Sequence, residues 1–589
     1  MRSDKGIAII TALLIMVVVG LLATGGALVT RMELNIARND ASSLQAHYAA
    51  QAGLQKYKTI LFQYFRFLET ISGTQNPERT ACFDRMGTGM DIDRDGSEEY
   101  LWSGGEITFA EEWVKNSSGE EVGSYVVTIH RDSGNKNMFT IESKGRSNGA
   151  RATVRSTLLV ENTGVLENAI FTGQGQTNQY LNGGVTIRGG VYVVGDENNP
   201  NNTVIGANGN FSMLNEYDLT NGNYEAMRYR VSDGNRVADN LCASLRVDNG
   251  QVELNGSVKL GDPSNWLLGV YIGDSQEDLK VTDTLLQCVE NKGICSEIGR
   301  FTLDLSEGGA PKFPLLGDEP AEESGCTEAT WSDCIFQSGL KNGLVVAHVA
   351  STGAGYPLFG STGAQDGVSD ECEDFLSDPL LVFSNSAVDC TYTDANGVLQ
   401  GFRYTTSNGW SSASFQVYGT VSLHGYDVKF DWPVEYVAKT LNGPTEADVE
   451  DWNASFVVEA NGSGAGGGID INQNFLTSDD EIDITGKKRL FPDHVLGLVA
   501  EGEVYQRAAN VMAPVYAGDT FRIIKGNKIL GSVVANKFCT TSAGDSIDCN
   551  AGQNAEVIYV NTGHNKPDIM QYVDSAGIPL FKVLSYERR

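Results

Sequence analysis

The chain has 589 residues, 20% of them charged and 41% apolar, which is ordinary for a folded protein and long enough for two or more domains. Its net charge of −32 argues against a general attraction to nucleic acid or anionic membranes, although residues 486–589 hold 12 basic against 10 acidic side chains and are the best place for a phosphate contact. The 67 glycines, only 14 prolines and short β-branched runs favour an all-β body with many tight turns.

The N-terminal region reads as one long helix. Residues 7–30 contain no charge, and a helix of that length spans roughly 36 Å, enough to cross a bilayer. A secretory signal peptide has a shorter apolar core followed by a small-residue cleavage site, whereas here Arg31 follows directly. The stretch "RMELNIARNDASSLQAHYAAQAGLQKYKTILFQYFRFLET" continues without proline, with apolar residues mostly three or four apart. We expect a helix from residue 7 to about residue 70, with residues 7–30 transmembrane.

A charged head, Lys5-Gly6 and then this helix resemble a type IV pilin precursor, and "ARNDASSLQAHYAAQAGL" is similar to the PilX-like and competence minor pilins. The resemblance implies that a prepilin peptidase removes residues 1–6 by cutting between Gly6 and Ile7 and methylates Ile7. It also implies a single-pass inner-membrane anchor before assembly. A plain membrane anchor and a cleaved signal peptide are the alternatives.

One position departs from the family pattern. Most pilins carry glutamate at the fifth mature position, where it pairs with the N-terminal ammonium group of a neighbouring subunit, but here that position is Thr11. A subunit with no neighbour above it can lose a buried charge that would otherwise be costly. Thr11 therefore resembles the pattern of a tip subunit.

Residues 71–162 are expected to complete a pilin module with a small antiparallel sheet. A loop precedes three predicted strands, "SYVVTIHRD", "KNMFTIESKGR" and "ARATVRSTLLVEN". Within the loop, "DIDRDGSEEY" alternates oxygen ligands around a glycine, as short calcium loops do. An EF-hand would need glutamate at the twelfth place, which is Trp102, so this is a calcium loop of the shorter extracellular kind or simply an acidic turn. The predicted Ca²⁺ ligands are Asp91, Asp93, Asp95, Ser97 (through its carbonyl) and Glu99.

Residues 163–575 are expected to form a large all-β domain. "GGVYVVGD", "GVYIGD" and "PVYAGD" repeat a strand followed by Gly-Asp, and Ala500, Ala517 and Ala535 lie 17 and 18 residues apart. Such a period suits one coil of a β-solenoid with small residues stacked inside. A solenoid joined to a pilin module resembles the ComZ-type competence minor pilins, where the solenoid is inserted in the pilin fold. A β-sandwich or two stacked β domains are the alternatives, and residues 576–589 are expected to form a final strand.

Ten cysteines without a CxxC motif favour disulfides in an oxidising compartment over a metal site or free thiols. Eight are close neighbours in sequence, and the remaining two are left for each other. The predicted pairs are Cys288–Cys295, Cys326–Cys334, Cys372–Cys390, Cys539–Cys549 and Cys82–Cys242.

No HExxH, GxSxG or Walker A pattern occurs, so we expect no enzymatic activity. The combined interpretation is a minor pilin at the extracellular tip of a type IV pilus, in contact with other minor and major pilins. Its β domain would bind an extracellular ligand, and DNA taken up during natural transformation is the leading candidate. The alternatives are a tip adhesin that primes assembly and grips a surface receptor, a tip pseudopilin of type II secretion, and an anchored extracellular enzyme. The residues predicted to contact DNA are Lys487, Lys488, Arg489, Arg522, Lys525 and Lys528.

Overall fold

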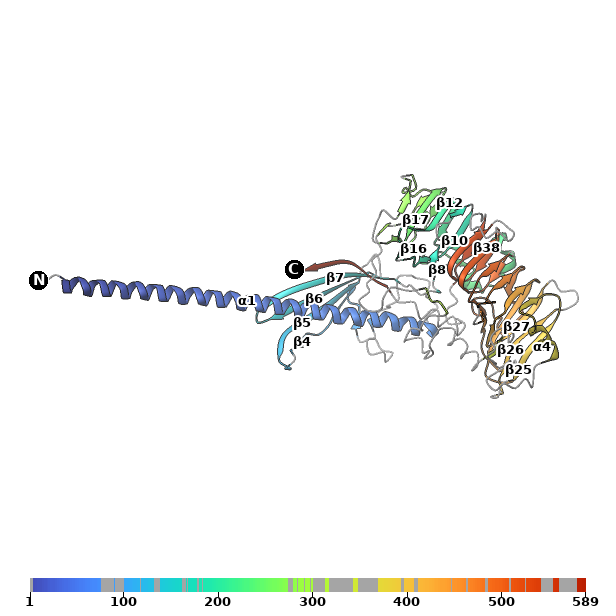
Figure 1. The fold of residues 1–589 in the computed structure, drawn as a ribbon, viewed down its shortest axis with the longest axis horizontal. Coiled ribbons are helices and arrows are strands. Elements are labelled where there is room, and N and C mark those ends of the chain that lie inside the picture. The colour runs from blue at the N-terminus through green and yellow to red at the C-terminus, as the bar shows by residue number, and fades with distance from the viewer. Residues whose placement is uncertain are drawn as a thin grey trace. The chain divides into compact units, whose positions relative to one another are not determined.

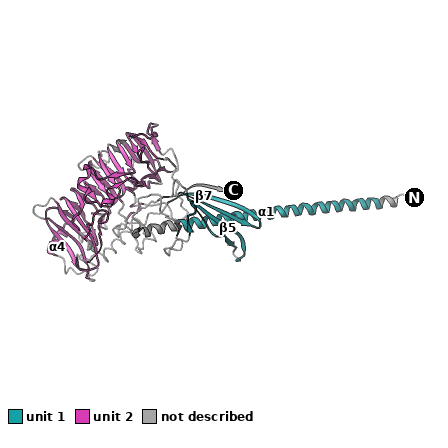
Figure 2. Cartoon of the chain, turned by 180° about the vertical axis from the view of Figure 1, so that it is seen from behind, with its two compact units in different colours: residues 1–68, 83–160, 581–589 teal, residues 69–82, 161–580 magenta. Residues whose placement is uncertain are grey.

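The computed structural model describes residues 4–588, with gaps at 76–88, 91–99, 117, 132–137, 162–165, 167, 177–179, 183, 197, 274–278, 283, 291, 297, 300–312, 317–342, 348–368, 394–396, 407–411, 446–447, 462–463, 482–485, 508–509, 525, 542–553 and 561–579. The chain divides into two compact units (Figure 2). Unit 1 comprises residues 1–68, 83–160 and 581–589, and unit 2 comprises residues 69–82 and 161–580. Each unit is described by itself below.

The predicted helix is confirmed and is slightly longer than expected. Helix α1 (Asp4–Gln75) has 72 residues (Figure 1). Among the described residues it is the one helix long and apolar enough to cross a membrane, and that apolar part is exposed. Nothing lies within 4 Å of a Cβ atom placed on Gly20, Gly25 or Gly26, so this part of α1 has no packing partner among the residues that the structure describes. The helix therefore presents its first half to whatever surrounds the protein.

The later part of α1 packs on a sheet through small residues. Ala46, Ala49 and Ala50 are at most 1% exposed. A Cβ atom placed on Gly145 of the sheet would lie 2.0 Å from the Ala46 carbonyl oxygen and 2.5 Å from the Ala50 nitrogen. Because no side chain fits there, glycine and alanine let the helix backbone approach the strand closely. Leu54, Tyr57 and Leu61 extend the buried side of α1, where they join the unit 1 core with side chains of the sheet.

The sheet of unit 1 has the strand order β3-β5-β6-β7-β42, with β4 also paired to β5, and β5, β6 and β7 are antiparallel. The three predicted strands of this region are confirmed as β5, β6 and β7, and the predicted final strand is confirmed as β42, which adds to the sheet at β7. Unit 2 is thus inserted in the chain between two neighbouring strands of the unit 1 sheet. The strands of unit 1 are β1 (Gly89–Met90), β2 (Tyr100–Leu101), β3 (Glu106–Thr108), β4 (Glu112–Lys115), β5 (Glu121–Arg131), β6 (Met138–Ser147), β7 (Ala150–Glu161) and β42 (Leu580–Arg588).

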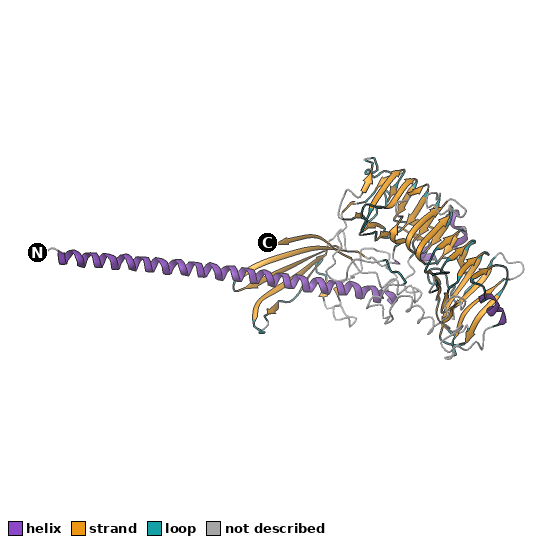
Figure 3. Cartoon of the chain, viewed as in Figure 1, coloured by secondary structure: helices purple, strands orange, loops and turns teal. Residues whose placement is uncertain are grey.

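Unit 2 is built almost entirely from strands (Figure 3), and its two long sheets consist mostly of parallel strands. The 13-stranded sheet contains β21 (Gly293–Ile294), β18 (Lys259–Leu260), β13 (Phe211–Leu214), β10 (Val185–Arg188), β41 (Ala555–Ile558), β39 (Lys528–Leu530), β37 (Asn510–Met512), β34 (Phe475–Thr477), β30 (Val434–Leu441), β27 (Ala413–Tyr418), β26 (Leu399–Thr405), β25 (Val388–Thr393) and β31 (Val449–Asp451). The 15-stranded sheet contains β22 (Ile298–Gly299), β19 (Gly269–Ile272), β16 (Ser244–Val247), β11 (Val191–Val193), β8 (Ile170–Gly175), β40 (Val533–Thr541), β38 (Val515–Ile524), β35 (Val495–Ala500), β32 (Asn453–Glu459), β28 (Thr420–His424), β23 (Gly343–Ala347) and a branch of β24 (Leu380–Phe383), β29 (Asp427–Phe430), β33 (Ile469–Ile471) and β36 (Val504–Gln506).

The spacing of the three alanines corresponds to the strand register. Ala500 is paired with Ala517, and Ala517 with Ala535, in parallel register. All three are fully buried in the large core of unit 2. Side chains at the same register position stack on neighbouring strands, which lie about 4.8 Å apart. Because this position holds a small residue in each turn of the chain, larger core residues of the facing sheet have room beside it. The spacing of 17 and 18 residues in the sequence therefore corresponds to one turn of the chain, and each turn adds one strand to this sheet.

The order of the strands shows that unit 2 is assembled in two halves. The first half runs outward from β8 through β11, β16 and β19 to β22. The chain then resumes at the opposite end with β23 and returns through β28, β32, β35 and β38 to β40, which pairs with β8. A second junction joins β41 to β10, with Val557 paired to Ile187. The first and last turns of unit 2 are consequently neighbours, as an insertion between two adjacent strands requires.

Shorter elements cover the long sheets. Tyr217, Tyr224 and Met227 come from one excursion of the chain and pack on the outer side of the 13-stranded sheet, against Leu530 and Ile558 among others. Helix α4 (Asp370–Leu376) packs against β25, to which the disulfide Cys372–Cys390 ties it. The remaining elements are β14 (Tyr217–Asp218), η2 (Gly222–Tyr224), α2 (Glu225–Arg228), η3 (Asp233–Asn235), β15 (Val237–Ala238), α4 (Asp370–Leu376) and the four-stranded sheet of β20 (Leu279–Val281), β17 (Gln251–Gly256), β12 (Thr203–Gly209) and β9 (Tyr180–Asn182).

Candidate functional site

The first predicted basic cluster lies between strands β34 and β35. Lys487 and Lys488 are exposed and Arg489 is partly buried. The Lys488 ammonium group donates a hydrogen bond of 2.8 Å to the Asp479 carbonyl oxygen, and the Arg489 backbone N–H donates one of 2.9 Å to the Glu481 carbonyl oxygen. These contacts hold the loop in place, while the lysine charges remain at the surface.

The second predicted cluster is separated by the fold. Arg522 belongs to β38 of the 15-stranded sheet, whereas Lys528 belongs to β39 of the 13-stranded sheet, and Lys525 lies outside the described residues. The Arg522 Nε lies 2.6 Å from Glu503 Oε1, and the Lys528 Nζ lies 5.6 Å from the centre of the Tyr224 ring. Closeness in sequence therefore does not produce one basic surface here, because the chain turns from one sheet to the other between these residues.

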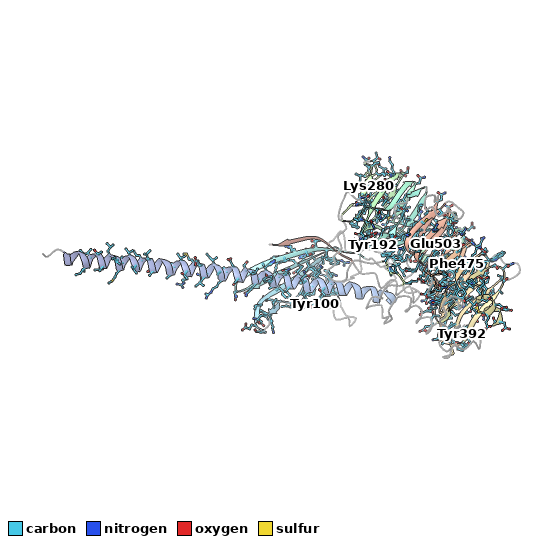
Figure 4. The ribbon with its side chains drawn as sticks, in the orientation of Figure 1. Tyr100, Tyr192, Lys280, Tyr392, Phe475 and Glu503 are labelled. Atoms are coloured by element: carbon cyan, nitrogen blue, oxygen red, sulfur yellow. A yellow bond between two sulfur atoms is a disulfide. The ribbon has the colours of Figure 1, made fainter. Side chains whose placement is uncertain are left out.

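Instead, Arg522 belongs to a band of ion pairs that runs from the branch of the 15-stranded sheet onto β38 and β40. Lys429, Asp470, Tyr505 and Arg522 occupy one register row across β29, β33, β36 and β38. Figure 4 labels Glu503, the acidic partner of Arg522, which directly precedes β36 in the chain. The other pairs in the band are Lys429–Asp431 at 2.9 Å, Arg507–Asp470 at 3.0 Å and Lys537–Asp519 at 3.9 Å. Apart from Arg522, these residues were not singled out from the sequence, since only the register reveals that they lie together.

The pKa values of the acidic side chains in this band shift in different directions. Burial raises the pKa of the Glu503 carboxyl above its ordinary value, although the Arg522 charge opposes the rise. Burial likewise raises the pKa of Asp470 against the effect of Arg507. For Asp431, burial is outweighed by hydrogen bonds from Asn472 and Lys429, and its pKa is lowered. A phosphate group approaching Arg522 has to compete with a partly buried carboxylate.

The cysteines follow the predicted pairing where the structure describes both partners. Cys288–Cys295 and Cys372–Cys390 are disulfides that close intervals of 7 and 18 residues. Cys242 and Cys539 are also disulfide-bonded, and their partner cysteines lie outside the described residues. Cys82, Cys326, Cys334 and Cys549 lie outside the described residues too, so three predicted pairs stay predictions.

The predicted calcium ligands Asp91, Asp93, Asp95, Ser97 and Glu99 also lie outside the described residues. Elsewhere in the described part of the chain, no group of three or more His, Cys, Asp or Glu side chains could hold a metal ion. Gly6, Ile7 and Thr11 all lie within α1.

Comparisons with known proteins match the N-terminal helix and nearly the whole chain. The family model described as PilX N-terminal matches residues 5–55. The crystal structure of the competence-associated pilin ComZ from Thermus thermophilus is similar to this chain, with 39% sequence identity and a TM-score of 0.64 over 93% of this chain and 97% of that one. A search of curated proteins finds no match.

The match includes both the helix and the large β unit, so the class of protein is a minor pilin of type IV pili. Within that class, the chain belongs to the ComZ type. Membership of this family fits an N-terminal helix that anchors the protein in the inner membrane and then enters a pilus alongside other pilins.

Proposed function

We propose that this protein is a non-catalytic minor pilin at the tip of a type IV pilus, where unit 2 binds extracellular DNA for uptake. The observation that carries the proposal is the similarity to a competence-associated pilin over 93% of the chain, which includes unit 2 as well as the helix. In this proposal unit 1 is the pilin module and unit 2 is a β-solenoid. The in-register stack of Ala500, Ala517 and Ala535 supports the solenoid.

The tip position rests on Thr11 and on the size of unit 2. Thr11 supplies no carboxylate for the ammonium group of a next subunit. An insert of more than four hundred residues (161–580) would also be difficult to repeat along a packed filament. Gold labelling of sheared pili should therefore mark filament ends, and label along the shaft would contradict the tip position.

Processing provides a second test of the pilin assignment. A prepilin peptidase is expected to cut between Gly6 and Ile7 and to methylate the new N-terminus. Mass spectrometry of the mature protein should find methylated Ile7 as the first residue. An N-terminus at Met1 or near Arg31 would be incompatible with this route to the pilus.

DNA binding can be measured with the full chain in detergent and a 30-base-pair duplex. Because phosphate contacts release counterions, affinity should fall steeply as salt rises. Replacing Lys487, Lys488 and Arg489 together by alanine should weaken binding about tenfold, on the order of 0.5 kcal/mol for each of the three contacts. The matched control replaces Lys280 and Lys292, which are exposed lysines elsewhere in unit 2, and should leave affinity unchanged.

An adhesin at the pilus tip is the second candidate, and the ion-pair band favours it. Arg522, Arg507 and Lys429 each lie beside a carboxylate, so these cations are less accessible to phosphate than their number suggests. Absence of DNA binding even at low salt, with binding to a surface receptor instead, would favour the adhesin and leave the pilin assignment intact.

Calcium is the proposed cofactor of the loop at residues 91–99. Three aspartates and a glutamate close together repel one another unless a cation lies between them. Adding Ca²⁺ should raise the melting temperature, and Asp93→Ala should abolish that rise. An equal rise in the variant would assign the calcium effect to another part of the chain.

A further inference from the structure

An exposed tyrosine at the surface of unit 2 carries an arginine on its ring. Tyr229 directly follows helix α2 and is 56% exposed. The Arg228 guanidinium carbon lies 4.3 Å from the centre of the Tyr229 ring, which is a cation–π contact. Arg228 also donates a hydrogen bond to the Tyr229 hydroxyl and one of 3.0 Å to the Thr220 carbonyl oxygen. These contacts hold the aromatic ring in one orientation, and apart from Arg228 no described residue makes a ring contact with it.

The fold brings this tyrosine beside the basic loop, the name used here for residues 487–489. The Phe491 backbone N–H donates a hydrogen bond of 2.8 Å to the Arg230 carbonyl oxygen. Tyr229 is one residue away from this hydrogen bond along its own segment, and Arg489 is two residues away along the other. Because consecutive Cα atoms are 3.8 Å apart, the Cα atoms of Tyr229 and Arg489 lie within roughly 18 Å of each other. Two segments that are distant in sequence therefore share one surface.

Buried contacts fix the tyrosine in this position. The Arg230 side chain donates a hydrogen bond of 2.8 Å to Glu435 Oε1 on β30 of the 13-stranded sheet. Met227, Val231 and Phe491 are fully buried in the cluster on the outer side of that sheet. The residues on both sides of the exposed ring are thus anchored to the sheet, and the ring itself faces away from it.

The surface around the tyrosine is basic, because two nearby acids are paired with cations that lie beneath it. Glu481 Oε2 lies 2.9 Å from the Nζ of Lys439, which is 4% exposed. Asp479 Oδ1 lies 3.7 Å from a guanidinium nitrogen of Arg230. The other charged residues that the structure describes in 225–230 and 478–489 are Glu225, Arg228, Asp480, Lys487, Lys488 and Arg489. Four basic and two acidic side chains leave a positive balance here, in a chain whose net charge is −32.

An exposed aromatic ring beside lysine and arginine matches the chemistry of unpaired nucleotides. Proteins that bind single strands stack successive bases on aromatic side chains and contact the phosphates with nearby cations. Along a duplex the faces of the bases are covered by one another, and a protein reaches the phosphates and the base edges in the grooves. A duplex can therefore use the cations of this surface, but only an unpaired base can also stack on the ring.

We propose that Tyr229, held by Arg228, is a stacking platform for an unpaired base of single-stranded DNA, whose phosphates contact the basic loop. This inference rests on the proposed function, because it assigns a base contact to the same DNA-binding unit. The cations attract any DNA, whereas the ring adds affinity for single-stranded segments alone. Unit 2 should consequently bind a single strand more tightly than a duplex of the same length.

The test compares two probes, a 30-nucleotide oligo-dT and a blunt 30-base-pair duplex, each titrated against the full chain in detergent. Tyr229→Leu should weaken oligo-dT binding at least fivefold, as loss of one stacked base does, and should leave duplex binding within twofold. Tyr229→Phe keeps the ring and should bind oligo-dT within twofold of the unaltered chain. The matched control is Trp113→Leu, which removes an aromatic side chain of equal exposure, 56%, from unit 1 and should change neither affinity.

Salt dependence and photo-crosslinking separate stacking from phosphate contacts. Tyr229→Leu should lower oligo-dT affinity by the same factor at every salt concentration, since no phosphate contact is lost, whereas alanine substitution of the basic loop should reduce the salt dependence. An oligonucleotide that carries 5-iodouracil should crosslink to Tyr229, as identified by mass spectrometry of the peptide.

The outcomes distinguish this inference from the proposed function. Unchanged oligo-dT binding by Tyr229→Leu, or an equal loss of oligo-dT and duplex binding, would overturn the stacking platform and leave DNA binding by unit 2 standing. Failure of the unaltered chain to bind either probe at low salt would overturn DNA binding and this inference together.

Discussion

In unit 1 the first half of α1 leaves its apolar side chains exposed, whereas in unit 2 the apolar side chains form a large core between long sheets. Ile9, Leu22 and Met32 are each at least 64% exposed, and apolar neighbours along the helix are similarly uncovered. In the described part of unit 2 the exposed large apolar side chains are scattered, for example Tyr229, Trp266 and Trp432. Isolated exposures of this kind are normal, but a continuous apolar surface requires a membrane or a protein to cover it.

The two units also achieve close packing differently. Unit 1 brings a helix against a sheet through Gly53 and Gly145, at whose Cα atoms no side chain can be accommodated. Unit 2 repeats a small residue at one register position from strand to strand, as Ala517 and its partners do. The packing of α1 on the sheet in unit 1 thus depends on a few positions that only glycine fits. The stability of unit 2 is instead distributed over many similar contacts between neighbouring strands.

The largest expected effect comes from Gly145→Val. The added Cβ would lie 2.0 Å from a helix carbonyl oxygen, and backbone atoms cannot move aside cheaply. We expect unit 1 to lose about 3 kcal/mol or more of its free energy of unfolding, as overpacking against a rigid neighbour does. Calorimetry of the full chain should show the unit 1 transition at lower temperature and the unit 2 transition unchanged.

Gly234→Ala provides the control for this variant, because nothing lies within 4 Å of the added Cβ. If Gly145→Val shifted the transitions of both units equally, the two units would unfold as one and the contrast drawn above would be wrong.

A smaller effect is expected from replacing Cys372 and Cys390 by serine. Their disulfide closes an interval of 18 residues and ties α4 to β25 at one end of the strand stack. Losing a loop closure of this length costs about 3 kcal/mol of stability on the chain-entropy model, and the loss should be confined to unit 2. Denaturant unfolding followed by far-UV circular dichroism measures it.

Replacement of Cys288 and Cys295 is the comparison for that measurement. Their interval of 7 residues is shorter, so the expected loss is closer to about 2 kcal/mol. Equal and negligible losses for both pairs would show that the strand stack needs neither disulfide.

The smallest expected effect concerns the pH dependence of DNA binding. Because burial raises the pKa of Glu503 above its ordinary 4.5, this carboxyl takes up a proton at higher pH than an exposed glutamate does. As pH falls toward that raised pKa, the Glu503 carboxylate is neutralised, so the ion pair with Arg522 weakens and phosphate meets less competition for the guanidinium group. We expect affinity for the duplex to rise about two- to threefold between pH 7 and pH 5.

Glu503→Gln removes the titrating group without changing its size. This variant should bind DNA more tightly at pH 7 and should show a flatter pH dependence than the unaltered chain. An identical pH dependence in both proteins would show that Arg522 does not contact DNA.

The features of the fold that depend on residues close together in the chain could be predicted from the sequence. The helix followed from an uncharged run joined to a proline-free amphipathic segment, and it differs from the expected bounds by three residues at the start and five at the end. The stack of Ala500, Ala517 and Ala535 followed from their spacing, because each turn of the chain repeats one local pattern. The disulfides Cys288–Cys295 and Cys372–Cys390 followed from short intervals, since a short loop closes at small entropic cost.

Features that depend on strand register came only from the tertiary structure. The sequence period did not show that β40 pairs with β8, or that the chain begins its second half at the far end of the stack. The sequence analysis grouped Arg522 with Lys528, but the structure separates them, because consecutive segments of one turn belong to different sheets. The pairing of Arg522 with Glu503 and the hydrogen bond that brings Tyr229 beside the basic loop likewise required the tertiary structure. Pairing between parallel strands joins residues far apart in the chain, and a local pattern carries no information about which distant strand supplies the partner.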